Sequence, residues 1–392
     1  MTLPTLGWPH AMPKLNPTLL ALLRDDLRAD APDLSALDWD ALLPEAQRQG
    51  VAPLLYYRLQ AAGQVQNLPQ PAAGALHLAF HRQWGKNQMR AQTLEHVLRL
   101  LAPIGLRPIA LKGAGLVLTV YDELAVRPMD DVDLLVAPEE FRPALQQLLA
   151  HGGVATHDEP FDGAYELVTH HVALRFPAVS AVVVELHHQW LSLPARQAGL
   201  VAMAELRGRA QRATLGGQAV DVLGAEDQVL HLCGHLAIHS AVMQRLIWVY
   251  DVDQVIRQAG AALDWGAIVE RAQRYQMALP LRQVLESVVG AFATPLPAAL
   301  PARLAALPVS KAERQRYGVE ARGPHSRLGD GAQKLAGLPD LPSRLRFAWR
   351  LAFPARAFMR RQHPNDSPLR LAARYPARWL AVLREYAALR EE

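Results

Sequence analysis

The segment Arg107–Val136, RPIALKGAGLVLTVYDELAVRPMDDVDLLV, contains two apolar runs separated by a short helix-compatible segment. The first run ends at Lys112 and Gly113, and the second run carries Asp131 and Asp133. Residues i and i+2 of a strand lie on the same side of a sheet, so a strand beginning at Asp131 would point both carboxylates into one cleft. Two oxygen ligands on a rigid strand suit a Mg²⁺ ion that also holds a triphosphate. The segment therefore predicts a metal site.

A third carboxylate, Glu185, lies in the apolar run AVVVELHH, residues 181–188. If this strand pairs with the one that carries Asp131 and Asp133, the three acidic groups can hold one or two Mg²⁺ ions and deprotonate an attacking hydroxyl. An unpaired Glu inside a buried strand would be costly. The alternative is a strand end at which Glu185 reaches water. His187 shares the face of Glu185 and is a further candidate for the site.

The turn LKGAG, residues 111–115, is the candidate phosphate-binding element. A glycine-rich turn between a strand and a helix lets backbone N–H groups approach phosphate, and the helix N-terminus adds a positive dipole. Lys112 or Arg127 could neutralise the β- and γ-phosphates. The turn matches neither the P-loop nor the dinucleotide-binding pattern, and by itself it is typical of an ordinary strand-to-helix connection.

A second pair of aspartates with the same spacing, Asp251 and Asp253, lies in WVYDVDQV, residues 248–255. The pattern there is helical, so the two side chains point to different sides of the helix and cannot share one ion.

A histidine stripe, His231, His235 and His239, repeats at every fourth residue of a predicted helix. The favoured interpretation is that these histidines form hydrogen bonds between helix and sheet. The alternatives are contact with phosphate or acceptor in the cleft, or a transition-metal site that would need further ligands.

The order of patterns predicts an α+β protein in which a mixed β-sheet core with packed helices is flanked by helical regions at both ends. Strands are expected at Glu166–His170, Val172–Phe176 and Ala181–His188. The expected organisation is an N-terminal helical region (1–104), the sheet core (105–190), a helical domain (191–321) and a basic C-terminal tail (322–392).

Composition narrows the class of protein. The chain of 392 residues has one cysteine, so no intrachain disulfide is possible and a reducing cytoplasm is expected. No apolar run is long enough for a transmembrane segment, and we expect no signal peptide. The tail from Arg322 carries fourteen Lys and Arg against six Asp and Glu, so it could contact an acidic partner or serve as a solvated surface.

Three motifs in this order, LKGAGL, RPMDDVDLLV and VVELHHQW, resemble the uncharacterised nucleotidyltransferase family of the DNA polymerase β-like superfamily. The later run EDQVLHLCGHLAIHS…LIWVYDVDQVI is similar to the helical region of that family, so the resemblance extends from about residue 17 to the helices near residue 290. It implies a nucleotidyltransferase-type core over the predicted sheet.

The resemblance also implies roles for individual residues. Asp131 and Asp133 take the place of the metal-binding D-x-D, Glu185 that of the third carboxylate, and Gly113 that of the loop glycine. The chain departs from the superfamily pattern in two ways. Lys112-Gly113 stands where Gly-Ser is usual, so the hydroxyl contact to phosphate is either missing or supplied from elsewhere. The third acid is Glu where Asp is commoner.

These features together predict a metal-dependent nucleotidyltransferase that moves a nucleoside monophosphate from an NTP to a hydroxyl or phosphate acceptor and releases pyrophosphate. Mg²⁺ is the expected cofactor, with Mn²⁺ as the alternative. The acceptor could be a small molecule, a peptide or protein, a sugar or RNA. One alternative is a non-catalytic module of the same fold that binds nucleotide or RNA; another is a D-x-D glycosyltransferase that uses a nucleotide sugar.

Overall fold

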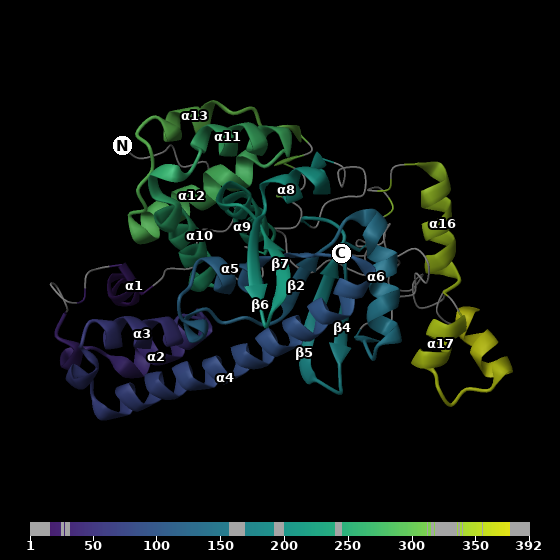
Figure 1. Ribbon diagram of the computed structural model, residues 1–392, viewed down its shortest axis with the longest axis horizontal. Helices are drawn as coiled ribbons and strands as arrows, with labels where there is room; N and C mark the ends of the chain where they lie inside the picture. Colours follow the sequence, from purple (N-terminus) through teal and green to yellow (C-terminus); the bar gives the residue numbers. More distant parts are fainter. Residues whose placement is uncertain are drawn as a thin grey trace, which may run out of the picture.

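A seven-stranded mixed sheet forms the centre of the protein in this computed structural model (Figure 1). The structure describes residues 16–24, 27, 32–156, 169–191, 200–239, 245–311, 313–314, 317, 335, 338, 340–354 and 356–376. The strands are β1 (Ile109–Ala110), β2 (Val132–Leu135), β3 (Val154–Ala155), β4 (His171–Phe176), β5 (Ser180–His187), β6 (Gln211–Leu215) and β7 (Gln218–Val222). Their order in the sheet is β3-β4-β5-β2-β1-β7-β6.

The sheet is mixed because β2 runs parallel to β5 and antiparallel to β1, while β1 runs parallel to β7. Helices pack against both of its faces. The helices of the described residues include α1 (Pro17–Arg24), α2 (Trp39–Arg48), α3 (Ala52–Ala61), α4 (Gln70–Leu101), α5 (Lys112–Thr119), α6 (Pro138–Ala150), α8 (Met203–Arg209), α9 (Ala225–His239), α10 (Leu246–Ala259), α11 (Trp265–Arg274), α12 (Ala278–Phe292), α13 (Leu300–Ala306), α16 (Leu341–Ala352) and α17 (Arg356–Gln362). This architecture confirms the predicted α+β class.

The alternation of side chains along β2 separates two hydrophobic cores. Val132 and Leu134 point to the face that packs against α4 and α6. Leu135 points to the opposite face and joins the core formed with α9, α10 and α12. Asp133 has the same parity as Leu135, so its carboxylate lies on the face toward α9 and α10. Figure 1 shows α4 along one side of the sheet and α9 to α13 gathered on the other.

Two of the three expected strands are confirmed as β4 and β5. The expected strand Glu166–His170 falls mostly outside the described residues, and its last two residues, Thr169 and His170, are described but not in a strand.

The hairpin of β6 and β7 lies where only helices were expected. Its turn is formed by Gly216 and Gly217, whose φ angles of 56° and 78° are left-handed. A Gly-Gly turn between β-compatible runs is a hairpin signal, but β7 is held in the sheet by its pairing with β1, more than a hundred residues earlier. The sheet therefore continues beyond residue 190, where we expected the core to end.

The described part of the basic tail contains the amphipathic helix α16 and the short α17. Arg344, Arg346 and Arg350 lie on α16 beside exposed apolar side chains such as Leu345 and Trp349. Among the described helices, none combines the length and the apolar character that a bilayer crossing requires.

Candidate active site

Strand pairing places two of the three predicted carboxylates side by side. In the parallel ladder of β2 and β5, Asp133 is the direct partner of Glu185, and Leu135 is the partner of His187. Because residues i and i+2 share a face, the side chains of Asp133, Glu185 and His187 all lie on the face toward α9. The expected pairing of these two strands is confirmed.

Asp131 immediately precedes β2 and is half-buried in the same cavity wall. Burial, followed by the nearby charge of Asp133, raises the pKa of Asp131 to about 7, although the Lys112 ammonium acts in the opposite direction. A carboxyl group with such a pKa carries only part of its charge near neutral pH and is ready to bind a further cation.

Asp133 is almost fully buried and accepts two hydrogen bonds at one oxygen. Lys112 Nζ lies 2.6 Å from Asp133 Oδ1, and His187 Nε2 lies 2.9 Å from the same atom. Burial acts to raise the pKa of Asp133, but the Lys112 ammonium and the hydrogen bond from His187 outweigh it and hold the pKa well below its usual range. Asp133 is therefore charged at neutral pH.

Lys112 and Gly113 are the first two residues of α5, which follows β1 after Leu111. Lys112 has a left-handed φ of 46°, uncommon for a non-glycine residue. A Cβ atom on Gly113 would lie 2.7 Å from Met129 Cγ and 3.0 Å from Arg127 Nη1, so only glycine fits there without movement of its neighbours. Burial acts to lower the pKa of Lys112, but the charges of Asp133 and Asp131 raise it above its usual value.

Arg127 also lines the cavity, but its guanidinium pairs with Asp251 on α10 and not with the three acids of the site. Arg127 Nη2 lies 2.7 Å from Asp251 Oδ2 on α10, and the Tyr121 hydroxyl donates to Asp251 Oδ1 over 2.6 Å. The pKa of Arg127 is raised, because the charge and hydrogen bonds of Asp251 outweigh burial. Arg127 is thus a fixed buried cation at the cavity wall.

Glu185 is bracketed by two imidazoles. His187 Nε2 lies 3.3 Å from Glu185 Oε2, and His171 Nε2 lies 3.4 Å from Glu185 Oε1. Burial acts to raise the pKa of Glu185, but the hydrogen bond from His187 and the nearby His171 lower it below its usual value. Burial also lowers the pKa of His171, to about 4, with the His187 charge acting in the same direction.

These side chains open onto one cavity of about 310 Å³. All seven predicted site residues line it: Lys112, Gly113, Arg127, Asp131, Asp133, Glu185 and His187. Besides His231 and His235 of the histidine stripe, eight further residues that were not predicted as site residues line it: Met129, Asp130, His170, His171, Trp190, Leu191, Ile238 and Trp248. The His170-His171 doublet was a usable signal, because it lies where the predicted strand Glu166–His170 ends and just before the predicted strand Val172–Phe176, which precedes the strand that carries Glu185.

The histidine stripe on α9 approaches the cavity from the opposite side. His231 is buried beside Trp190, with ring centroids 5.7 Å apart, and burial lowers its pKa to about 3. His235 is half-buried and packs edge-on against Trp248 at 5.2 Å. The side chain of His239 lies outside the described residues. Within the described residues the stripe forms no three-ligand group of its own.

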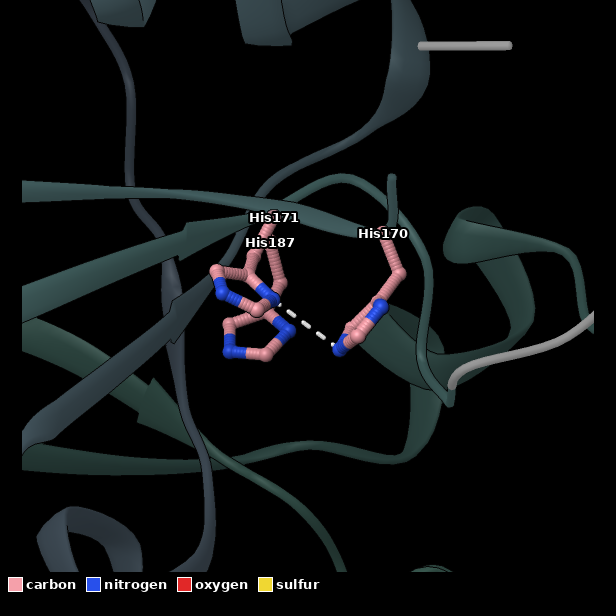
Figure 2. A group of neighbouring side chains, drawn as sticks. All are labelled: His170, His171 and His187. Atoms are coloured by element: carbon pink, nitrogen blue, oxygen red, sulfur yellow. Dashed lines mark hydrogen bonds between the residues drawn. The ribbon is translucent and has the colours of Figure 1, made fainter. Parts of the chain in front are cut away.

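The side chains at the cavity include oxygen and nitrogen atoms of the kinds that bind the metal ion implied by the resemblance. One candidate group contains Asp133, Glu185 and His187, with one ligand atom of each within 4.8 Å of the others. The carboxylates, together with the partly charged Asp131, are hard oxygen donors that fit Mg²⁺ or Mn²⁺. A second group contains His170, His171 and His187 (Figure 2).

Comparison with known proteins agrees with the resemblance seen in the motifs. The sequence model of a family described as "Uncharacterised nucleotidyltransferase" matches residues 35–292, about two thirds of the chain. Two solved structures are similar at low identity. The antibiotic-resistance factor ANT(2'')-Ia is 13% identical with a TM-score of 0.34, over 52% of this chain and 95% of that one. An antigenic nucleotidyltransferase-like protein from Paracoccidioides brasiliensis is 20% identical with a TM-score of 0.33, over 57% and 95%. No curated protein sequence matches the chain.

Proposed function

The chain belongs to the uncharacterised nucleotidyltransferase family, and from this premise we propose that it transfers a nucleoside monophosphate from an NTP to a hydroxyl or phosphate acceptor. One observation carries the proposal: Asp133 and Glu185 are direct partners on adjacent parallel strands, with Asp131 at the same cavity. Three acids converging on one cavity are the arrangement that phosphoryl-transfer chemistry needs.

Asp131, Asp133 and Glu185 would hold a divalent ion, Mg²⁺ or Mn²⁺. When bound, the ion would neutralise charge on the phosphate oxygens and on the attacking oxygen. Two properties of the chain support this assignment. Asp133 carries full charge, and Asp131 has a pKa of about 7, so a cation at the cavity would convert Asp131 to its charged form.

Lys112, Gly113 and Arg127 would bind the triphosphate. Gly113 lies in the first turn of α5, where the helix dipole favours negative charge, and its lack of a side chain lets Arg127 and Met129 pack against that turn. The flexible side chain of Lys112 can exchange Asp133 for a phosphate oxygen by rotation of its methylene groups. Arg127, fixed by Asp251, would supply positive charge that does not move.

In the transfer step, an acceptor oxygen would form a bond to the α-phosphorus while the bond from that phosphorus to the α,β-bridging oxygen breaks, and pyrophosphate leaves. The proton of an acceptor hydroxyl would pass to Glu185. His187 would orient the acids, because its Nε2 lies within hydrogen-bonding reach of both Asp133 and Glu185.

A second candidate function is nucleotide binding without catalysis. The observation that favours it is the 2.6 Å ion pair of Lys112 with Asp133, which places an ammonium group on an oxygen that a metal ion would otherwise use. Such a protein would bind NTP and form no product.

The test uses wild type, Asp133→Asn and the exposed control Asp122→Asn, each incubated with α-labelled NTPs, Mg²⁺ or Mn²⁺, and fractions of host extract as acceptors. We expect label transfer and pyrophosphate release with wild type and Asp122→Asn, and neither with Asp133→Asn. NTP binding by calorimetry without transfer under any condition would instead support the binding module. Equal turnover by wild type and Asp133→Asn would refute the proposed role of the carboxylates.

A further inference from the structure

Three histidines converge on one side of the acidic site (Figure 2). His171 begins β4 and His187 ends β5, and the two residues are direct partners in the antiparallel ladder of these strands. His170 precedes β4, and its ring centroid lies 4.4 Å from that of His171 and 5.5 Å from that of His187. Figure 2 shows the rings of His171 and His187 one beside the other, both facing His170.

The ring nitrogens divide into an outer and an inner set. The Nε2 atoms of His187 and His171 face carboxylates. His187 Nε2 lies 2.9 Å from Asp133 Oδ1, and His171 Nε2 lies 3.4 Å from Glu185 Oε1. On the inner side, His171 Nδ1 lies 2.9 Å from His170 Nε2. Since Nε2 of His187 bonds to carboxylates, its Nδ1 remains, and one ring nitrogen of His187 lies toward His170 in Figure 2.

This division is the one that metal-binding histidines adopt. A ligating imidazole presents one nitrogen to the ion and donates the N–H of the other to a carboxylate, which fixes the tautomer and increases ligand basicity. One ligand nitrogen from each of the three histidines lies within 4.8 Å of the others. With small rotations of the rings, this spacing would allow all three nitrogens to bind one ion at Zn–N distances of about 2.0–2.1 Å.

We propose that His170, His171 and His187 form a second metal site, for Zn²⁺ or another divalent transition ion that prefers imidazole, with a fourth position open to the cavity. Imidazole donors suit Zn²⁺, Co²⁺ and Ni²⁺, whereas Mg²⁺ selects oxygen. The carboxylates of Asp133 and Glu185 compensate the positive charge from behind the rings. This site goes beyond the proposed function and does not depend on it, because its donors are nitrogen atoms rather than the three acids.

Metal binding to the full chain tests the proposal directly. Chelator-treated protein is titrated with Zn²⁺ against a chromophoric competitor, and separately with Co²⁺, whose visible d–d bands distinguish four-coordinate nitrogen ligation from a loosely bound hydrated ion. The variants are His170→Gln and His171→Gln, with the exposed His151→Gln as the matched control. Circular dichroism and thermal melts verify that each variant is folded.

We expect one high-affinity Zn²⁺ per chain and an intense Co²⁺ spectrum for wild type and for His151→Gln. Loss of a direct ligand in His170→Gln or His171→Gln should weaken Zn²⁺ binding by about 100-fold or more, since even outer-shell partners contribute about 10–100-fold. A weak, six-coordinate Co²⁺ spectrum in wild type would overturn the proposal without use of any variant. Unchanged affinity in both histidine variants would also overturn it.

The experiment separates this inference from the proposed transfer reaction. Asp131→Asn should lose nucleotidyl transfer and retain one Zn²⁺, because Asp131 belongs to neither the ligand nitrogens nor the carboxylates that face them. Transfer without Zn²⁺ binding would remove only the histidine site. Zn²⁺ binding without transfer would remove only the proposed activity.

Discussion

The chain contains two Asp-x-Asp pairs, and the fold gives them opposite uses. Asp131 and Asp133, at the start of β2, share a cavity with Glu185, and within the described part of the chain no lysine or arginine forms an ion pair with Asp131. Asp251 and Asp253 lie on α10, where two residues differ by about 200° around the axis. The same spacing therefore gives convergent side chains on a strand and divergent ones on a helix.

Each helical aspartate has its own arginine. Asp251 binds Arg127 over 2.7 Å, and Asp253 binds Arg257 over 2.8 Å and also accepts a 2.6 Å hydrogen bond from Thr294. The Asp251 pair connects α10 to the loop before β2, the Asp253–Arg257 pair lies within α10, and the Thr294 hydrogen bond connects α10 to the end of α12. The comparison shows that Asp251 and Asp253 are each committed to an arginine, whereas Asp131, with its raised pKa, is available for a cation.

The largest expected difference between the pairs concerns activity. Asp133→Asn keeps the side-chain shape and removes the charge, so nucleotidyl transfer should fall by about 10³-fold or more, as expected when several kcal/mol of charge stabilisation are lost. Initial rates of pyrophosphate release measure this loss. If Asp253→Asn, a substitution in the helical pair, lowers the rate of the folded protein by a similar factor, the two pairs do not differ in their role in activity.

Asp251→Asn should have the largest effect on stability. The substitution leaves the Arg127 guanidinium, which is only 7% exposed, without a counter-charge. Removal of one partner of a buried ion pair costs about 3–5 kcal/mol of unfolding free energy. Urea denaturation followed by circular dichroism gives the value, and a loss below about 1 kcal/mol would contradict a structural role for the pair.

Asp131→Asn should increase the free energy of unfolding, whereas Asp251→Asn should decrease it. The folded-state pKa of Asp131 is raised to about 7 from the ordinary 3.8. The protonated Asp131 side chain therefore makes its full contribution to the free energy of unfolding below about pH 4. This contribution is lost as the pH rises through about 7. In chelator, the variant should gain about 2–4 kcal/mol over wild type at pH 8 and little at pH 4.

Parallel urea titrations at the two pH values provide the measurement for Asp131→Asn. Added Mg²⁺ should restore most of the wild-type stability at pH 8, because a bound cation compensates the charge. If the variant is less stable than wild type at pH 8, the charged Asp131 side chain stabilises the fold, as Asp251 and Asp253 do.

Asp253→Asn should show the smallest effect. The Arg257 side chain is 42% exposed and can be hydrated when its partner loses charge, while the Asn oxygen can still accept from Thr294. The expected loss is about 1–2 kcal/mol, in the range for a hydrogen bond to a charged group. A loss equal to that of Asp251→Asn would show that arginine exposure does not distinguish the two pairs.

Local patterns predicted much of the site. The two-residue period identified the strands of Asp133 and Glu185, and their side-by-side placement followed once these strands paired. The helical period of α10 correctly separated Asp251 from Asp253. The β6–β7 hairpin was missed because its strands have short, weakly apolar sequences, and they are held by pairing with β1 rather than by local preference.

Residue type and backbone period were enough to predict which residues are ionisable and which of them share a face of a strand or helix. Their partners, and with them the charge state of Asp131, depend on the three-dimensional fold. It directs Lys112 to Asp133, fixes Arg127 on Asp251 and brings His170 and His171 to His187. Those contacts join residues from separate elements, and the order of strands in the sheet, which no local pattern contains, brings them together.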